Sequence, residues 1–146
     1  MNYKKWLIDD LKNLRRDKFA VVQLTSELET IEAEYASIKA TDYDKMPGGK
    51  GDNVQEQKLL DAIARKEEKV ACLKATKLHV ADMERLLGQL AADEKEIIER
   101  TFINEERCSH DVLAEELGCS VRTINYKKQD ALDHLARLRF GAAYRP

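Results

Sequence analysis

The first forty residues carry an apolar stripe at helical spacing. No proline or glycine interrupts the segment from 3 to 39. Its apolar side chains recur every seven and every three to four residues: Leu7, Leu11, Leu14, Val21, Leu24, Leu28, Ile31, Tyr35 and Ile38. This period predicts a long amphipathic helix of coiled-coil type. The stripe is wider than a two-stranded coiled-coil seam, so another segment of this chain or a second copy must cover it.

A second helical pattern follows a stretch of turn-forming residues. The segment 41–53 contains Pro47 and three glycines, and we interpret it as a flexible connector. From 54 to about 78, one face is apolar and carries Leu59, Ile63, Val70 and Leu73. The opposite face is charged and includes Arg65, Lys66, Glu68 and Lys69. The pattern predicts that residues 1–78 form a helical hairpin whose two arms bury their stripes against each other.

Short apolar segments separated by capping residues make up residues 79–146. The first apolar face comprises Met83, Leu86, Leu87 and Leu90. Asp93 is the predicted N-cap of a helix over 94–102, because Glu96 completes a capping box. Ser109 and Ser120 are the predicted N-caps of two further helices; Gly118 ends the first, and the second runs from 121 to about 138. We therefore predict an all-α fold with two domains, 1–78 and 79–146.

The composition agrees with this fold class and limits the location of the protein. Half of the 146 residues are Ala, Glu, Lys, Leu or Arg, a composition typical of long helices. The apolar runs are far shorter than the ~20 residues that cross a bilayer. The N-terminal segment is charged throughout, where a signal peptide needs an apolar stretch. We expect a cytoplasmic protein without a membrane partner.

Residues 109–132 carry the spacing of a helix-turn-helix. Two helices cross closely at this angle when a small residue lies inside the first, a residue tolerant of positive φ lies in the turn, and apolar residues of the second pack on the first. The residues expected to form this core are Ala114, Leu117, Gly118, Ile124 and Ala131. A plain pair of crossed helices without DNA contact is the alternative that this spacing leaves open.

Charge placement favours nucleic acid as the partner of this segment. The net charge of the whole chain is only −2, so any electrostatic function is local. Residues 120–146 carry six cations against two anions, whereas residues 82–106 carry eight acidic residues against three cations. This distribution predicts a basic face where a recognition helix meets phosphate, with an acidic face behind it.

The start of the last predicted helix supplies side chains suited to double-stranded DNA. Residues expected to read base edges are Val121, Arg122, Asn125, Tyr126 and Gln129. Residues expected to contact the DNA backbone, through hydroxyl or ammonium groups, are Ser120, Thr123, Lys127 and Lys128. The division depends on how the helix is rotated in the major groove.

Several motifs in residues 80–140 resemble the fourth region of bacterial sigma factors. They are Met83-Glu-Arg-Leu-Leu, Glu96-Ile-Ile-Glu-Arg, Leu113-Ala-Glu-Glu-Leu-Gly-Cys-Ser-Val-Arg-Thr-Ile and Ala131-Leu-Asp-His-Leu. The long N-terminal helix followed by Met46-Pro47-Gly48-Gly49 is similar to phage-encoded regulators of the ArpU and RinA type. Val121 and Tyr126 differ from the longer polar readers of primary sigma factors, so the recognised DNA sequence does not carry over.

This resemblance implies a phage or prophage transcription regulator that binds double-stranded DNA through residues 120–129. Contact with RNA polymerase and dimerisation through the stripe from 7 to 38 are open partner hypotheses. Two other functions compete with this one. A small terminase-like DNA-packaging protein would form a ring of eight or more subunits, and a helical scaffold would bind no DNA.

Catalytic and metal-binding patterns are weak in this sequence. The histidines His79, His110 and His134 lie on separate predicted helices without metal-ligand spacing. The three cysteines lack a Cys-x-x-Cys pair and are expected to be reduced thiols. No acidic pair lies in an apolar setting that would tune a general acid. We expect neither enzymatic activity nor a cofactor nor a metal ion.

Overall fold

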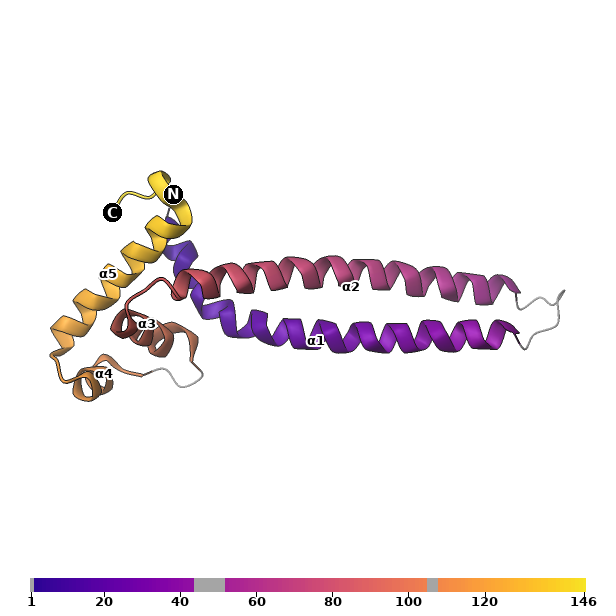
Figure 1. Ribbon diagram of the computed structural model, residues 1–146, viewed down its shortest axis with the longest axis horizontal. Helices are drawn as coiled ribbons and strands as arrows, with labels where there is room; N and C mark the ends of the chain where they lie inside the picture. The colour runs from indigo at the N-terminus through magenta and orange to yellow at the C-terminus, as the bar shows by residue number, and fades with distance from the viewer. Residues whose placement is uncertain (1, 44–51, 105–107) are drawn as a thin grey trace. The chain divides into compact units, whose positions relative to one another are not determined.

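The chain is all-α, as predicted, in a computed structural model that describes residues 2–43, 52–104 and 108–146 (Figure 1). Its α-helices are α1 (Tyr3–Tyr43), α2 (Asp52–Leu87), α3 (Ala92–Ile98), α4 (His110–Leu117) and α5 (Val121–Phe140). A π-helical turn, Glu99–Ile103, continues α3, and a 3₁₀ turn, Gly141–Ala143, follows α5. The described residues contain no strand. Among these helices, none is long and apolar enough to cross a membrane.

Both long helices extend further than the sequence pattern indicated. Residues 41–43 and 52–53, which we assigned to the connector, are helical, and the rest of it, 44–51, lies outside the described residues. The second helix does not end near residue 78 but continues to Leu87. It does so because Gly88 is the first residue after 53 with very poor helix propensity.

The chain divides into two compact units, to which both long helices contribute. Unit 1 comprises Met1–Asp17 and His79–Pro146, and unit 2 comprises Lys18–Leu78. The sequence-based division at 78 and 79 falls at one of these boundaries. Residues 1–17, however, group with the C-terminal part of the chain, whereas we had assigned them to the hairpin.

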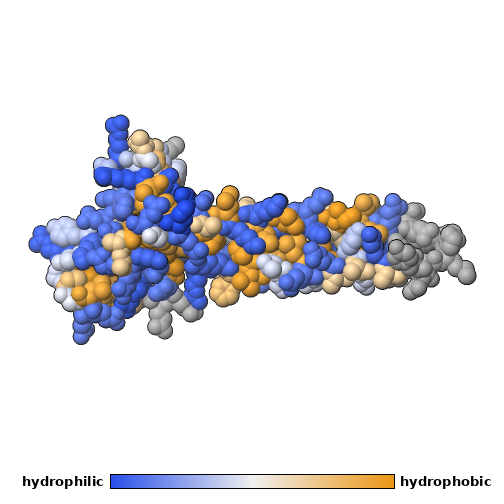
Figure 2. All heavy atoms as spheres, in the orientation of Figure 1, coloured by the Kyte–Doolittle hydropathy of each residue, from blue (hydrophilic) through white to orange (hydrophobic). Residues whose placement is uncertain are grey.

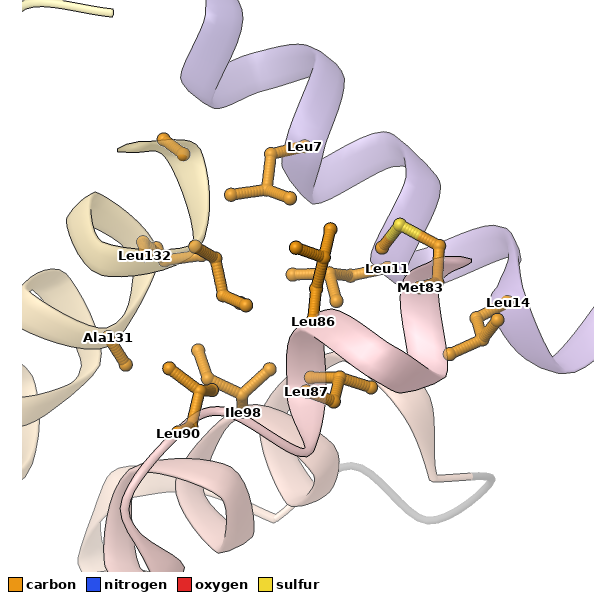
Figure 3. Close-up of a cluster of buried hydrophobic side chains, with 12 residues drawn as sticks. Leu7, Leu11, Leu14, Met83, Leu86, Leu87, Leu90, Ile98, Ala131 and Leu132 are labelled. Atoms are coloured by element: carbon orange, nitrogen blue, oxygen red, sulfur yellow. The ribbon is translucent and has the colours of Figure 1, made fainter. Parts of the chain in front are cut away.

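The core of unit 1 explains this grouping (Figure 3). Leu7, Leu11 and Leu14 of α1 are fully buried. They share one hydrophobic cluster with residues from the end of α2, from α3 and from α5: Met83, Leu86, Leu87, Leu90, Ile98, Ala131, Leu132, Leu135 and Ala136. In Figure 3, Leu7 and Leu11 point toward the α2 side chains Met83 and Leu86. The first third of the N-terminal stripe is thus covered by this chain itself.

Polar contacts join the first turns of α1 to the C-terminal half of α5 at the surface of unit 1. Arg139 of α5 forms an ion pair with Asp10 of α1. The ammonium nitrogen of Lys4 lies 3.2 Å from a carboxylate oxygen of Asp133. These contacts align the first turns of α1 along the C-terminal half of α5.

Unit 2 is an antiparallel pair formed by residues 18–43 of α1 and 52–78 of α2 (Figure 1). Three ion pairs cross between the helices: Glu27 with Lys69 at 2.8 Å, Glu32 with Lys66 at 3.5 Å, and Glu34 with Arg65 at 3.0 Å. Partner numbers fall along α2 as they rise along α1, which establishes the antiparallel direction. We had predicted that these cations lie on the face opposite the contact between the helices. They lie beside that contact instead.

Unit 2 buries few apolar side chains. Leu24, Ile31 and Ala62 are buried, together with Gln55, whose side-chain amide donates to the backbone carbonyl of Ile38 at 3.2 Å. Other members of the predicted stripes, including Val21, Leu28, Tyr35, Leu59, Val70 and Leu73, are half-buried. Ile63, which we placed on the buried face, is 39% exposed. Two helices alone cannot enclose stripes of this width.

We predict that Leu11→Ala lowers the free energy of unfolding of unit 1 by about 2–5 kcal/mol, because it removes a fully buried side chain and leaves a cavity. Denaturant unfolding followed by the fluorescence of Trp6, the only tryptophan of the chain, measures this effect within unit 1. The matched control is Val112→Ala at a 41% exposed position of α4 in the same unit, with an expected change well below that of Leu11→Ala. Equal stability of the two variants would contradict the shared core.

Candidate nucleic-acid interface

Helices α4 and α5 are joined by a short turn, and three predicted caps bound the two helices. The Ser109 hydroxyl accepts a hydrogen bond from the Val112 amide at 3.4 Å, and the Ser120 hydroxyl accepts one from the Thr123 amide at 3.2 Å. Gly118 ends α4 in the left-handed region, at φ 69°. These three predictions are confirmed, since each depends only on neighbouring residues.

The predicted cap at Asp93 is wrong. Helix α3 begins at Ala92 with Ala91 as its N-cap, and no side chain caps it. Asp93 lies inside the first turn, where one of its oxygens accepts from the Glu94 amide at 2.9 Å. The N-cap therefore lies two residues before the predicted one. An acidic residue in the first turn still stabilises the helix through its interaction with the helix dipole.

A small apolar core holds α4 and α5 against α3. It consists of Ile97 of α3, Leu113 and Ala114 of α4, and Ile124 of α5, with Leu117 partly buried against them. Three of the five predicted core positions, Ala114, Leu117 and Ile124, therefore lie in this core. Gly118 is exposed at the end of α4.

Ala131 does not belong to this small core. It is fully buried in the cluster that contains Leu7 and Met83. Ala131 lies two turns after Ile124, about 10 Å further along the helix axis. Helix α5 is much longer than α4 and reaches a second core there.

All five predicted base-reading side chains are exposed. They lie at intervals of one, three and four residues on the first half of α5, which places them on one helix face: Val121, Arg122, Asn125, Tyr126 and Gln129. Val121 is 41% exposed and Tyr126 is 59% exposed. The guanidinium of Arg122 donates to the Tyr126 hydroxyl at 3.2 Å and lies 5.6 Å from the ring centre. Polar donors and acceptors are therefore presented beside two apolar surfaces.

The two hydroxyl groups predicted to contact the DNA backbone are bonded to each other. The oxygens of Ser120 and Thr123 are 2.9 Å apart. Ser120 is exposed and also caps α5, whereas Thr123 is half-buried. Both hydroxyls thus lie at the N-terminus of α5, where backbone amides point toward solvent and favour an anion.

Lys127 is not a free cation. Its ammonium nitrogen lies 2.8 Å from a carboxylate oxygen of Asp93, whose other oxygen bonds the Glu94 amide. The ion pair raises the pKa of Lys127 and lowers the pKa of Asp93. The acidic segment that we expected behind the basic face therefore reaches it at this point and neutralises one of its charges.

The side chain of Lys128 is partly buried within unit 1. Its ammonium nitrogen lies 3.3 Å from Nε2 of His110, the first residue of α4. Burial, and then the nearby positive charge of Lys4, lower the pKa of Lys128. Lys128 is half-buried, in contrast to the exposed residues Arg122 and Gln129. Lys128 is thus less accessible to a phosphate than the sequence pattern suggested.

Arg100 is a positioning residue that the sequence reasoning missed. It lies in the π-helical turn and forms an ion pair with Glu116 of α4. Its guanidinium also donates to the sulfur of Cys108 at 3.2 Å. The carboxylate of Glu116 is the main cause that raises the pKa of Arg100. Sixteen residues separate the two partners, so no helical spacing could have revealed the contact.

The described ranges 2–43, 52–104 and 108–146 contain no group of three or more His, Cys, Asp or Glu residues placed to hold a metal ion. The three cysteines are free thiols. Cys72 is exposed, whereas Cys108 and Cys119 are half-buried beside the small core of α3, α4 and α5.

Comparisons with known proteins gave no match. No protein-family model, no curated protein and no solved structure matches this chain.

We predict that the carboxyl group of Asp93 titrates below its ordinary pKa of 3.8, because Lys127 stabilises the carboxylate. The Asp93–Lys127 pair then stabilises the fold above pH 3.8, and this contribution is lost as the pH falls through the lowered pKa of the folded state. NMR titration of the carboxyl carbon measures the midpoint, which should rise in Lys127→Met. It should move little in Lys95→Met, which removes a nearby charge bonded elsewhere. Equal midpoints in parent and Lys127→Met would contradict the ion pair.

Proposed function

We propose that the chain is a sequence-specific, double-stranded DNA-binding transcription regulator of phage or prophage type. In this proposal α4 and α5 act as a helix-turn-helix, and α5 enters the major groove with its N-terminal half. Arg122, Asn125 and Gln129 read base edges, while Val121 and Tyr126 contact thymine methyl groups. The exposed hydroxyl of Ser120 and the neighbouring amides bind phosphate.

The observation that carries this proposal is the division of α5 into two faces. Ile124 is fully buried and fixes the helix against α3 and α4, while the five reading residues are exposed together on the solvent side. Base recognition needs side chains whose helix is held by packing on the opposite face.

The sequence resemblance to sigma factor region four and to ArpU and RinA regulators supports the same function. The resemblance to sigma factor region four includes residues that the helix-turn-helix proposal uses, from Leu113 to Ile124, whereas the resemblance to ArpU and RinA regulators concerns the N-terminal helix and the connector after it. Contact with RNA polymerase belongs to this proposal as the step that would follow DNA binding. A dimer formed through the stripe from 7 to 38 does not fit as well, because Leu7, Leu11 and Leu14 are already buried.

We predict that Arg122→Ala weakens binding to the preferred DNA site by about 1–3 kcal/mol and relaxes the choice of one base pair. The preferred site comes from selection of random DNA with the purified parent protein at near-physiological salt. Arg137→Ala is the matched control, since it removes the same charge from an exposed position near the other end of α5. Arg137→Ala should leave the selected sequence unchanged.

The same selection separates the competing functions. Retention of DNA without an enriched motif would contradict a regulator and favour a packaging role. Absence of retention would contradict DNA binding and favour a scaffold. Equal site preference in the parent and Arg122→Ala would contradict the assigned reading face.

We predict that Asp93→Asn strengthens binding to all DNA sequences, because it releases Lys127 from its ion pair. One additional phosphate contact steepens the slope of log K against log salt by about 0.9. Fluorescence anisotropy with random duplex DNA at several salt concentrations measures this slope. Asp9→Asn, which removes an exposed carboxylate of α1 that forms no ion pair with any described residue, should change it less. An unchanged slope in Asp93→Asn would show that Lys127 does not face DNA.

A further inference from the structure

Unit 2 leaves a stripe of α2 without a partner. Ile63 is 39% exposed and Leu78 is 66% exposed. Between them lies a groove of about 540 Å³. It is lined by Tyr35 of α1 and by Ile63, Lys66, Glu67, Val70, Ala71 and Lys74 of α2. Figure 2 shows hydrophobic residues at the surface over these helices. An exposed apolar stripe with charged residues inside it is typical of a contact between helices.

The stripe has a symmetric sequence. Ile63, Glu67, Val70, Lys74 and Leu78 follow one another at intervals of three and four residues, so they share one face of α2. Apolar and charged positions alternate in the same way from either end, about a midpoint between residues 70 and 71, but the two charged positions carry opposite charges. When a second copy of α2 lies antiparallel across a two-fold axis at that midpoint, residue n faces residue 141 − n, as a direct consequence of the numbering.

This arrangement matches the chemistry of the facing residues. Ile63 faces Leu78 of the second copy, so two exposed apolar side chains meet. Val70 faces Ala71 at the axis, where a small residue permits close approach. Glu67 faces Lys74, so opposite charges meet. The two-fold axis produces each of these contacts twice.

The charges on the stripe are available for such a contact. Lys66 and Lys69 are held by glutamates of α1, at 3.5 Å and 2.8 Å. In contrast, neither Glu67 nor Lys74 forms an ion pair with any residue in the described part of the chain. In a parallel pair in register, each of these residues would face its own copy and repel it. Charge complementarity therefore selects the antiparallel orientation.

We propose that this stripe is the interface of a homodimer, in which α2 of one chain packs antiparallel on α2 of a second. The interface lies on a flank of unit 2 and differs from the stripe at 7–38 that the sequence suggested. It completes a four-helix arrangement from two helix pairs. Neither DNA nor the reading face of α5 takes part, so the dimer and the proposed function can fail independently.

Charge exchange tests the interface and its direction. Sedimentation equilibrium without DNA should give a mass twice that of the 16.7 kDa chain for the parent. Glu67→Lys alone places like charges opposite each other at two points, as does Lys74→Glu alone. Each single variant should raise the dimer dissociation constant about ten-fold or more, given the usual strength of exposed charge pairs.

Recombining the two changes should restore the dimer. A mixture of the Glu67→Lys and Lys74→Glu chains should form a heterodimer with nearly the parent affinity, because each changed residue then faces an opposite charge. The double variant E67K/K74E should likewise recover as a homodimer. The matched control Glu68→Lys changes the same charge one residue away, on another face of α2, and should leave the dissociation constant within about two-fold.

Three results would overturn this proposal. They are a monomeric parent at high micromolar concentration, an assembly larger than a dimer, or single variants that are not rescued by mixing. Circular dichroism of each variant establishes that the helices remain formed, since all of these changes lie on exposed positions. A parent that selects a DNA motif yet stays monomeric would overturn the dimer alone.

Discussion

The burial of Leu7, Leu11 and Leu14 among the C-terminal helices is the contact on which unit 1 depends. The first turns of α1 supply three fully buried leucines to the cluster that encloses the second half of α5. The interactions of Arg139 with Asp10 and of Lys4 with Asp133 then fix α1 along α5. The N-terminal residues are thus part of the candidate DNA-binding unit and not only of an assembly arm.

Helix α5 connects this core with the candidate interface. Its second half is buried through Ala131, Leu132 and Leu135, and its first half is held through Ile124 by a smaller core. Packing at both ends leaves the side chain of Arg122 and its neighbours on a helix with little freedom to move. A rigid helix lowers the entropic cost of binding, which suits the DNA-reading role that we propose for this surface.

Intramolecular ion pairs reduce the number of unpaired charges on both surfaces for which we propose a partner. On α5, Lys127 forms an ion pair with Asp93, so the positive charge that faces solvent is smaller than the count of lysines and arginines indicates. On α2, Lys66 and Lys69 form ion pairs with glutamates of α1, which leaves Glu67 and Lys74 as the charges of the exposed stripe. In both places the intramolecular pairs decide which charges remain for a partner, and these pairs join residues that are distant in sequence.

The sequence alone determined the helical fold class, the caps Ser109, Gly118 and Ser120, and the buried positions Ala114 and Ile124. These features follow from local spacing, because capping and amphipathicity involve residues within one or two helical turns. Only the tertiary structure decided that residues 1–17 join the C-terminal unit and that Ala131 packs in the larger core. It also decided that Lys127 contacts Asp93 and that Lys128 contacts His110. Such contacts link positions 18 to more than 100 residues apart, where the periodicity of a helix carries no information about which stripe meets which.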